Sequence, residues 1–177
     1  DGNGSLLEIL DEKDNFAVAL DNAEDYPDVP EFESSQSITM PSGILSEALA
    51  NTLFATSNDS LRPVMPGVLF QFKEVETNFV STDSHRLVVY KREDLVNAEP
   101  MEFIMPKKPL SIFKNILANT NEDVAIDFIE NMAKFTFGNN IWIGRLIDVK
   151  YQIYSRVIQK EKRNVLKFNR GLFVERF

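Results

Sequence analysis

The chain has 177 residues, a formal net charge of −8 and no cysteine. Without cysteine, disulfides and thiolate metal sites are excluded. No apolar run approaches the roughly 20 residues that a membrane-spanning helix needs, and the first ten residues, DGNGSLLEIL, have no basic region ahead of the apolar ones, so we expect a soluble protein of the cytoplasm.

The charge is distributed unevenly along the chain. Residues 1–35 carry eleven acidic side chains against one base, Lys13, whereas residues 36–177 carry sixteen acids and eighteen bases. Within that second part, residues 146–177 hold three acids and eight bases. The overall acidity therefore does not exclude a polyanionic partner, although it does not predict one either.

The N-terminal part predicts a strand followed by a connector. Residues 15–20 alternate in polarity, with Phe16, Val18 and Leu20 on one face, which is typical of a strand. Residues 21–35 are rich in acid and contain two prolines, which continue neither a helix nor a strand ladder. We interpret this segment as an extended connector and as a domain boundary.

The rest of the chain predicts the same series of elements twice, namely a strand, a helix that starts at a proline, and three strands. In the first copy the strands are expected over 37–40, 64–72, 78–82 and 87–91, with the helix following Pro41. In the second copy they are expected over 102–105, 124–129, 133–137 and 141–147, with the helix following Pro106.

The two copies also have identical residues at matching positions. MPSGILS at residues 40–46 and MPKKPLS at residues 105–111 agree at four of seven positions. Together with the repeated order of elements, this agreement indicates an internal duplication. The fold class predicted is α+β, with two equivalent helices side by side on antiparallel sheets, each burying one apolar stripe.

The only histidine lies in STDSHRLVVY, residues 81–90. On a regular strand Asp83 and His85 share a face while Ser84 points away, so these three neighbours cannot form a catalytic relay. One interpretation is that Asp83 caps a turn and His85 is structural. The competing one is a hydrolase that uses Ser81 or Ser84 with His85. One histidine and scattered carboxylates predict neither a metal site nor a cofactor.

Five segments in order carry a more specific signal: DNAEDYPDVP, FATSNDSLRPVMPGVLFQF, STDSHRLVVY, FIMPKKPL and RLIDVKYQIYSRVI. Together they resemble the bacterial sliding clamp family, the beta subunit of DNA polymerase III. The resemblance implies the DNA-clamp fold, built from duplicated β-α-β-β-β units. It also implies three parts: the tail of a first clamp domain with a connector (1–35), a complete middle domain (36–163) and the start of a third (164–177).

The resemblance implies a non-catalytic processivity factor of the replicative DNA polymerase. In the family this is a ring-shaped, head-to-tail homodimer that encircles duplex DNA without reading its sequence. It docks polymerases and clamp-loader subunits through their short linear motifs and involves no membrane. The alternative is a clamp-fold peptide-binding module that does not encircle DNA.

Two surfaces follow from the resemblance, each carried over position by position. The peptide-binding pocket is expected to include Met65, Thr82, Ser84, His85, Arg86, Leu87, Gln152, Arg156 and Val157. The surface expected to face DNA includes Arg62, Lys107, Lys108 and Lys114.

The chain departs from the family pattern at several of these positions. Ser84 stands where the family has glycine, and if that position needs a positive φ, serine is strained there. Gln152 replaces a proline of the pocket, Val149 replaces a glycine and Gln159 replaces a proline.

Overall fold

The computed structural model describes residues 6–11, 13–26, 28, 36–58, 65–129, 131–151, 154–158 and 171. The chain divides into two compact units, Asp1–Phe32 and Glu33–Phe177. Among the helices of the described ranges, none combines the length and the apolar character needed to cross a bilayer.

The first unit contains a hairpin of two antiparallel strands, β1 (Leu6–Leu10) and β2 (Asn15–Ala19). The second strand was predicted, whereas β1, a short apolar run, was not. Leu7 pairs with Val18 and Ile9 with Phe16, and each of these four side chains is about half exposed. Because a lone two-stranded hairpin is marginally stable in water, this apolar face needs further chain to cover it.

The predicted connector is not extended throughout. A short 3₁₀ turn, η1 (Ala23–Asp25), follows the hairpin, and the backbone N–H of Glu24 donates to Oδ1 of Asn22 at 3.1 Å. Asparagine is favoured at such a cap because its side-chain oxygen satisfies a free backbone donor. Most of the remaining connector lies outside the described residues.

The second unit confirms the duplicated order of elements, with bounds that differ from the expected ones by a few residues. The first copy consists of β3 (Gln36–Pro41), α1 (Ser42–Thr52), η2 (Leu53–Ala55), β4 (Gly67–Phe72), β5 (Thr77–Thr82) and β6 (Leu87–Arg92). The second consists of β7 (Met101–Pro106), α2 (Lys107–Leu117), β8 (Asp123–Ile129), β9 (Met132–Phe137) and β10 (Asn140–Arg145), followed by η3 (Tyr154–Arg156).

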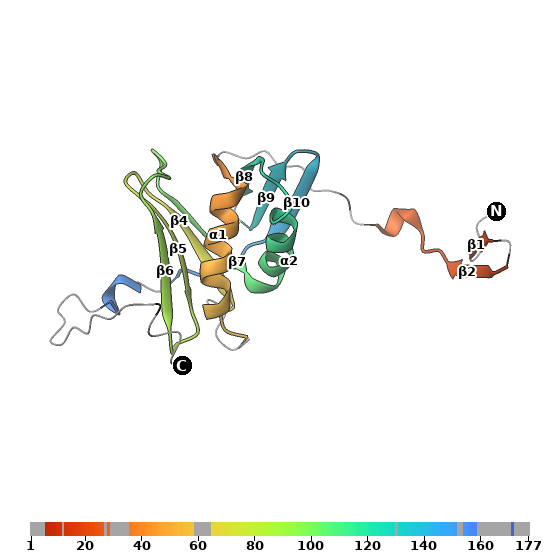
Figure 1. Cartoon of the computed structure of the whole chain (residues 1–177), viewed down its shortest axis with the longest axis horizontal. Helices are drawn as coiled ribbons and strands as arrows, with labels where there is room; N and C mark the ends of the chain where they lie inside the picture. Colours follow the sequence, from red (N-terminus) through yellow and green to blue (C-terminus); the bar gives the residue numbers. More distant parts are fainter. Residues whose placement is uncertain are drawn as a thin grey trace. The chain divides into compact units, whose positions relative to one another are not determined.

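The two copies exchange their first strands. The sheets have the orders β6-β5-β4-β7 and β10-β9-β8-β3, so β7 joins the sheet of the first copy and β3 joins that of the second (Figure 1). All of these pairs are antiparallel, with Val68 opposite Met105 and Met40 opposite Val124. Neither copy can therefore complete its sheet without the other.

The helices α1 and α2 contact each other and lie between the two sheets (Figure 1). Four of the residues that repeat in the sequence are fully buried: Met40 and Met105, next to the last residues of the exchanged strands, and Leu45 and Leu110, in the first turns of the helices. Large aromatic side chains fill the space around them, including Phe70, Phe79, Phe113 and Phe135.

The sheet β6-β5-β4-β7 has a second apolar face, turned away from the helices, which we call the outer face. Leu69, Val80 and Ile104 form its centre, and Tyr151 packs onto them. The chain that follows β10 thus crosses onto this face, where Tyr154 of η3 also lies. The outer face carries one of the two surfaces expected from the sequence.

Candidate functional site

The turn between β5 and β6 is held by the carboxylate of Asp83. Its Oδ1 accepts the backbone N–H groups of His85 and Arg86, both at 3.0 Å, and its Oδ2 accepts the Arg86 Nε–H at 2.8 Å. The backbone and side-chain hydrogen bonds from Arg86 lower the pKa of Asp83 to about 2. The prediction that Asp83 caps a turn is confirmed.

Ser84 occupies the tip of this turn with φ at 77°, and it is the one non-glycine residue of the described chain with a positive φ. The condition under which serine is strained at this position is therefore met. A side chain costs about 1 kcal/mol in that region. The Ser84 backbone N–H donates to Thr82 Oγ1 at 3.2 Å, and its hydroxyl donates to the sulfur of Met65 at 3.1 Å.

Met65, Ser84 and His85, three of the expected pocket residues, line one cavity of about 450 Å³. Its other walls come from Asp83 and from the segment after η2, namely Thr56, Ser57 and Asn58. Sequence reasoning did not assign these last three residues to the site. Two signals were available: these residues form a polar run directly after a predicted helix, and they belong to the segment FATSNDSLRPVMPGVLFQF that carries the family resemblance.

Two further expected pocket residues flank the cavity. Arg86 is fixed between the carboxylate of Asp83 and the ring of Phe54, whose centroid lies 5.6 Å from the guanidinium carbon. Leu87 starts β6 and packs at the edge of the apolar cluster on the outer face. Polar and apolar groups thus meet at this end of β5 and β6.

The η3 segment reaches the same face. The hydroxyl of Tyr154 donates to Gln71 Oε1 at 2.8 Å, which anchors the segment to β4. Arg156 ends η3, and the exposed Val157 follows it. Arg156 and Val157 are not among the residues that line the cavity beside Ser84, and Gln152 lies outside the described residues.

The hydrolase interpretation gains no support from the two serines. The hydroxyl of Ser81 is buried and donates to the backbone carbonyl of Thr52 at 2.7 Å, so it is directed toward α1. The hydroxyl of Ser84 donates to Met65. In the described part of the chain, no group of three or more His, Asp or Glu side chains is arranged to hold a metal ion.

The second expected surface lies on α2. Lys107 and Lys108 are its first two residues, and neither an acidic side chain nor a side-chain cap occupies the first turn. The ammonium of Lys107 donates to Asn58 Oδ1 at 3.0 Å, while Lys108 is exposed. Because the N-terminus of a helix carries a partial positive charge, these groups form a region that attracts anions.

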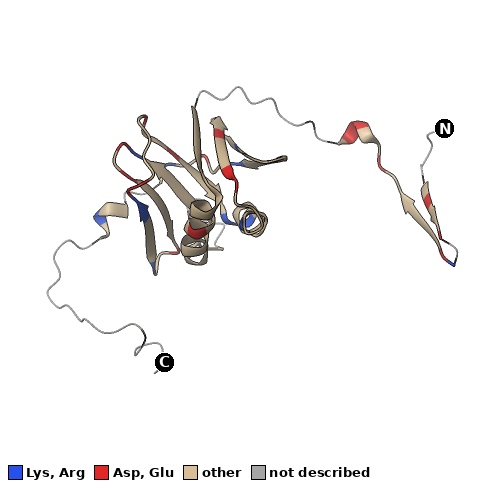
Figure 2. Cartoon of the chain, turned by 45° about the horizontal axis from the view of Figure 1, so that its top comes forward, with Lys and Arg blue, Asp and Glu red and all other residues tan. Residues whose placement is uncertain are grey.

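The two helices differ in charge (Figure 2). Glu47 is the only charged residue of α1, whereas the charged residues of α2 are Lys107, Lys108 and Lys114. Of the two α-helices, only α2 carries positively charged side chains. Arg62, the fourth residue expected to face DNA, lies outside the described part of the chain.

Comparison with known proteins identifies the relatives of this chain. A family model described as the central domain of the DNA polymerase III beta subunit matches residues 39–152. The beta sliding clamp of Staphylococcus epidermidis is 33% identical over 148 residues, which cover 84% of this chain and 39% of that protein. The beta sliding clamp of Halalkalibacterium halodurans is 29% identical over 155 residues, covering 86% and 41%.

A solved structure agrees with the sequence relatives. The crystal structure of the DNA polymerase sliding clamp from Bacillus subtilis matches with a TM-score of 0.79 and 30% identity, over 90% of this chain and 42% of that one. The chain thus spans about two fifths of the length of the curated relatives it matches.

Proposed function

This chain belongs to the family of DNA polymerase III beta subunits, the bacterial sliding clamps, and we propose that it is the middle part of a processivity factor. The full protein is a ring that encircles duplex DNA, tethers the replicative polymerase and catalyses no reaction itself. The main support for this proposal is that residues 39–152 match the model of the family's central domain. These residues hold most of the duplicated unit with its exchanged strands.

The proposed division of the chain follows the family plan. Residues 1–35 are the tail of a first clamp domain with its connector, 36–163 are the middle domain, and 164–177 begin a third. The half-exposed apolar face of the β1–β2 hairpin supports the first assignment, since such strands need a larger sheet. Head-to-tail closure of a dimeric ring requires the outer domains, so it belongs to the longer protein.

On the helix side, Lys107, Lys108 and Lys114, with Arg62, contact DNA phosphates. A closed ring retains the duplex by topology, so these contacts can be few, weak and independent of base sequence. The start of α2 supports this role, because two lysines at a helix N-terminus without a neighbouring acid favour a phosphate partner.

On the outer face, the pocket captures linear motifs of polymerases and clamp-loader subunits. The apolar cluster beside Leu87 receives the apolar anchors of the motif, and the side chains of Met65, Thr82, Ser84, His85 and Arg86 orient it. Gln152, Arg156 and Val157 complete the pocket in this proposal. A third domain supplies its remaining wall.

The alternative, a clamp-fold peptide-binding module without DNA encirclement, is not favoured, since the matched relatives carry the sliding-clamp name. Retention on DNA distinguishes the two functions. The full-length protein, loaded by its clamp loader onto nicked circular DNA, should stay bound through gel filtration and leave when the DNA is linearised. Equal loss from circular and linear DNA would contradict encirclement.

A further inference from the structure

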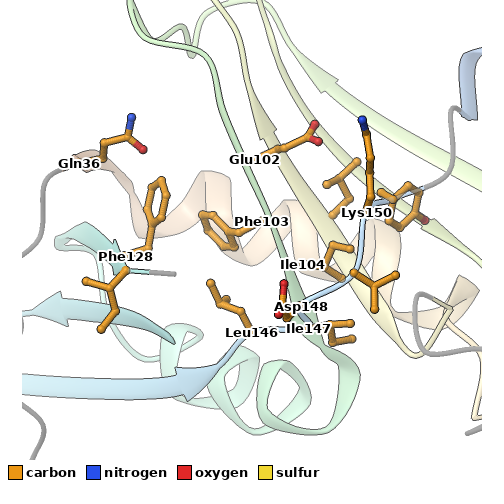
Figure 3. Close-up of a pocket in the computed structure, with 13 residues that line it drawn as sticks. Gln36, Glu102, Phe103, Ile104, Phe128, Leu146, Ile147, Asp148 and Lys150 are labelled. Atoms are coloured by element: carbon orange, nitrogen blue, oxygen red, sulfur yellow. The ribbon is translucent and has the colours of Figure 1, made fainter. Parts of the chain in front are cut away.

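A second cavity, of about 450 Å³, lies where the chain after β10 crosses between the two sheets (Figure 3). The backbone N–H of Leu146 donates to the carbonyl of Asn131 at 2.8 Å, and that of Ile147 donates to the carbonyl of Ile104 at 2.9 Å. These bonds fix one wall of the cavity. Its floor is apolar and consists of Leu69, Phe103, Ile104, Phe128, Leu146 and Ile147.

Charged groups surround this apolar floor, as Figure 3 shows for Glu102, Asp148 and Lys150. The carboxylate of Glu102 accepts a hydrogen bond from the Gln71 amide at 2.8 Å. In the part of the chain that the structure describes, no hydrogen bond or ion pair engages the side chain of Asp148 or of Lys150. The rim therefore holds two carboxylates against one ammonium group, and one of those carboxylates is uncommitted.

Tyr151 lines the same cavity and is only 7% exposed. Its hydroxyl is the one buried side-chain polar atom without a hydrogen-bond partner among the described residues. Burial raises the pKa of Tyr151 to about 12, so the hydroxyl keeps its proton and can both donate and accept. An unpartnered buried hydroxyl is costly for a folded protein, and a ligand or an ordered water that reached it would supply the missing partner.

We propose that this cavity binds a small amphipathic amine, with an apolar body about the size of an aromatic ring and one cationic nitrogen. The apolar body packs on Phe103, Phe128 and Leu146, and the nitrogen pairs with Asp148 at the rim. The cavity volume is within the range of sites for small molecules. The rings of the floor add attraction for a nearby cation. This cavity is distinct from the one beside Ser84, but Leu69, Ile104, Ile147 and Tyr151 also belong to the apolar cluster of the outer face. The amine site is inferred from its own lining and does not rest on the proposed clamp function.

Phenethylamine is a suitable probe, with 2-phenylethanol as its neutral analogue and 3-phenylpropionate as its anionic one. Each is titrated into the 177-residue chain while backbone amide shifts are followed by NMR. The amine should bind most tightly and the acid most weakly, with the largest shifts at Phe103, Ile104 and Ile147. Equal affinity for the three probes, or shifts centred elsewhere, would overturn the proposal.

Substitutions at the rim test the assigned roles. Asp148→Asn should weaken amine binding by about two- to fivefold, the range expected for a solvent-exposed ion pair. Asp123→Asn makes the same change in charge at an exposed position of β8 outside the cavity and should leave affinity unchanged. Lys150→Gln should tighten binding because a like charge is removed. Equal effects of the two aspartate variants would count against a specific pairing.

Tyr151→Phe separates a ligand contact from a structural role. In the free chain the variant should melt at the same or a higher temperature, because the native hydroxyl makes no hydrogen bond. Its affinity for phenethylamine should fall at least twofold. A lower melting temperature would show that the hydroxyl has a partner within the protein. A capped Gly-Trp-Lys-Gly peptide that binds more tightly than phenethylamine would overturn the assignment to a small free amine.

Discussion

The turn between β5 and β6 and the start of α2 both gather polar side chains, but they hold them differently. In the turn, Asp83 fixes two backbone N–H groups and the Arg86 side chain, and Ser84 keeps a left-handed backbone. On α2, Lys108 is exposed and the first turn has no side-chain cap. The first arrangement is preorganised for a shaped ligand, and the second suits a diffuse, sequence-independent one.

Because the two regions differ in this way, peptide binding and DNA binding should be lost through different substitutions. Changes in the turn should weaken peptide binding with little effect on DNA. Changes on α2 should do the opposite. Only damage to the shared core should affect both.

The largest effect is expected in that core. Phe113 is fully buried, stacks on Trp142 with ring centroids 4.7 Å apart, and packs against Phe135 with centroids 4.8 Å apart. Phe113→Ala should lower the free energy of unfolding by about 3–5 kcal/mol, because apolar burial is removed and a cavity is left behind. Urea unfolding of the 177-residue chain measures this. A change below about 1 kcal/mol would show that the packing of α2 on β9 and β10 contributes little to stability.

The next effect concerns the turn. In the full-length protein, Asp83→Ala should weaken binding of a Gln-x-x-Leu-Phe peptide about tenfold, because the backbone around His85 and Arg86 loses its acceptor. His85→Ala and Arg86→Ala should weaken it as well. Isothermal titration measures the affinities, with Asp123→Ala on β8 as the matched control. Unchanged affinity in all three turn variants would remove the pocket assignment.

Low pH should destabilise the same turn. The pKa of Asp83 is lowered from 3.8 to about 2, so its stabilising contribution is complete above pH 5 and disappears as the pH falls through 3.8 toward 2. Glu76 behaves alike, because its hydrogen bond from Lys91 lowers its pKa to about 2. Melting temperature should fall over this range, and Asp83→Asn should flatten part of the fall. An identical pH profile for the variant would contradict the capping role.

A smaller and opposite effect is expected at the tip of the turn. Ser84→Gly should raise stability by about 1 kcal/mol, because glycine carries no penalty at a φ of 77°. For a chain of this size that corresponds to roughly 2–4 °C in melting temperature. Ser84→Ala, which keeps the strain and removes only the hydroxyl, is the matched control and should not melt higher. Equal melting temperatures for the glycine and alanine variants would mean that the backbone is not strained.

Much of the fold could be predicted because its signals are local. Strand-like patterns located β2 and the strands of the second unit, apolar spacing located α1 and α2, and a turn capped by Asp83 was one of the interpretations of the segment around His85. The exchange of β3 and β7 could not be predicted, since the alternating pattern of a strand fits either neighbouring sheet equally well.

The two cavities could not be predicted from the sequence either, because tertiary packing forms them. The cavity beside Ser84 needs residues 56–58, which precede the turn by more than 20 positions and reach it only through the tertiary fold. The unpartnered hydroxyl of Tyr151 is likewise a property of packing. No letter in KYQIY distinguishes it from a tyrosine whose hydroxyl is paired.

The salt dependence of duplex binding by the full-length protein most directly tests whether DNA binding and peptide binding depend on different regions. Neutralising Lys107 and Lys108 together should reduce the slope of log affinity against log salt by about 2, close to one unit for each lysine that no longer neutralises a phosphate. His85→Ala should leave that slope unchanged. If the lysine variant kept the original slope, or if His85→Ala reduced it equally, α2 would not be the DNA-facing element.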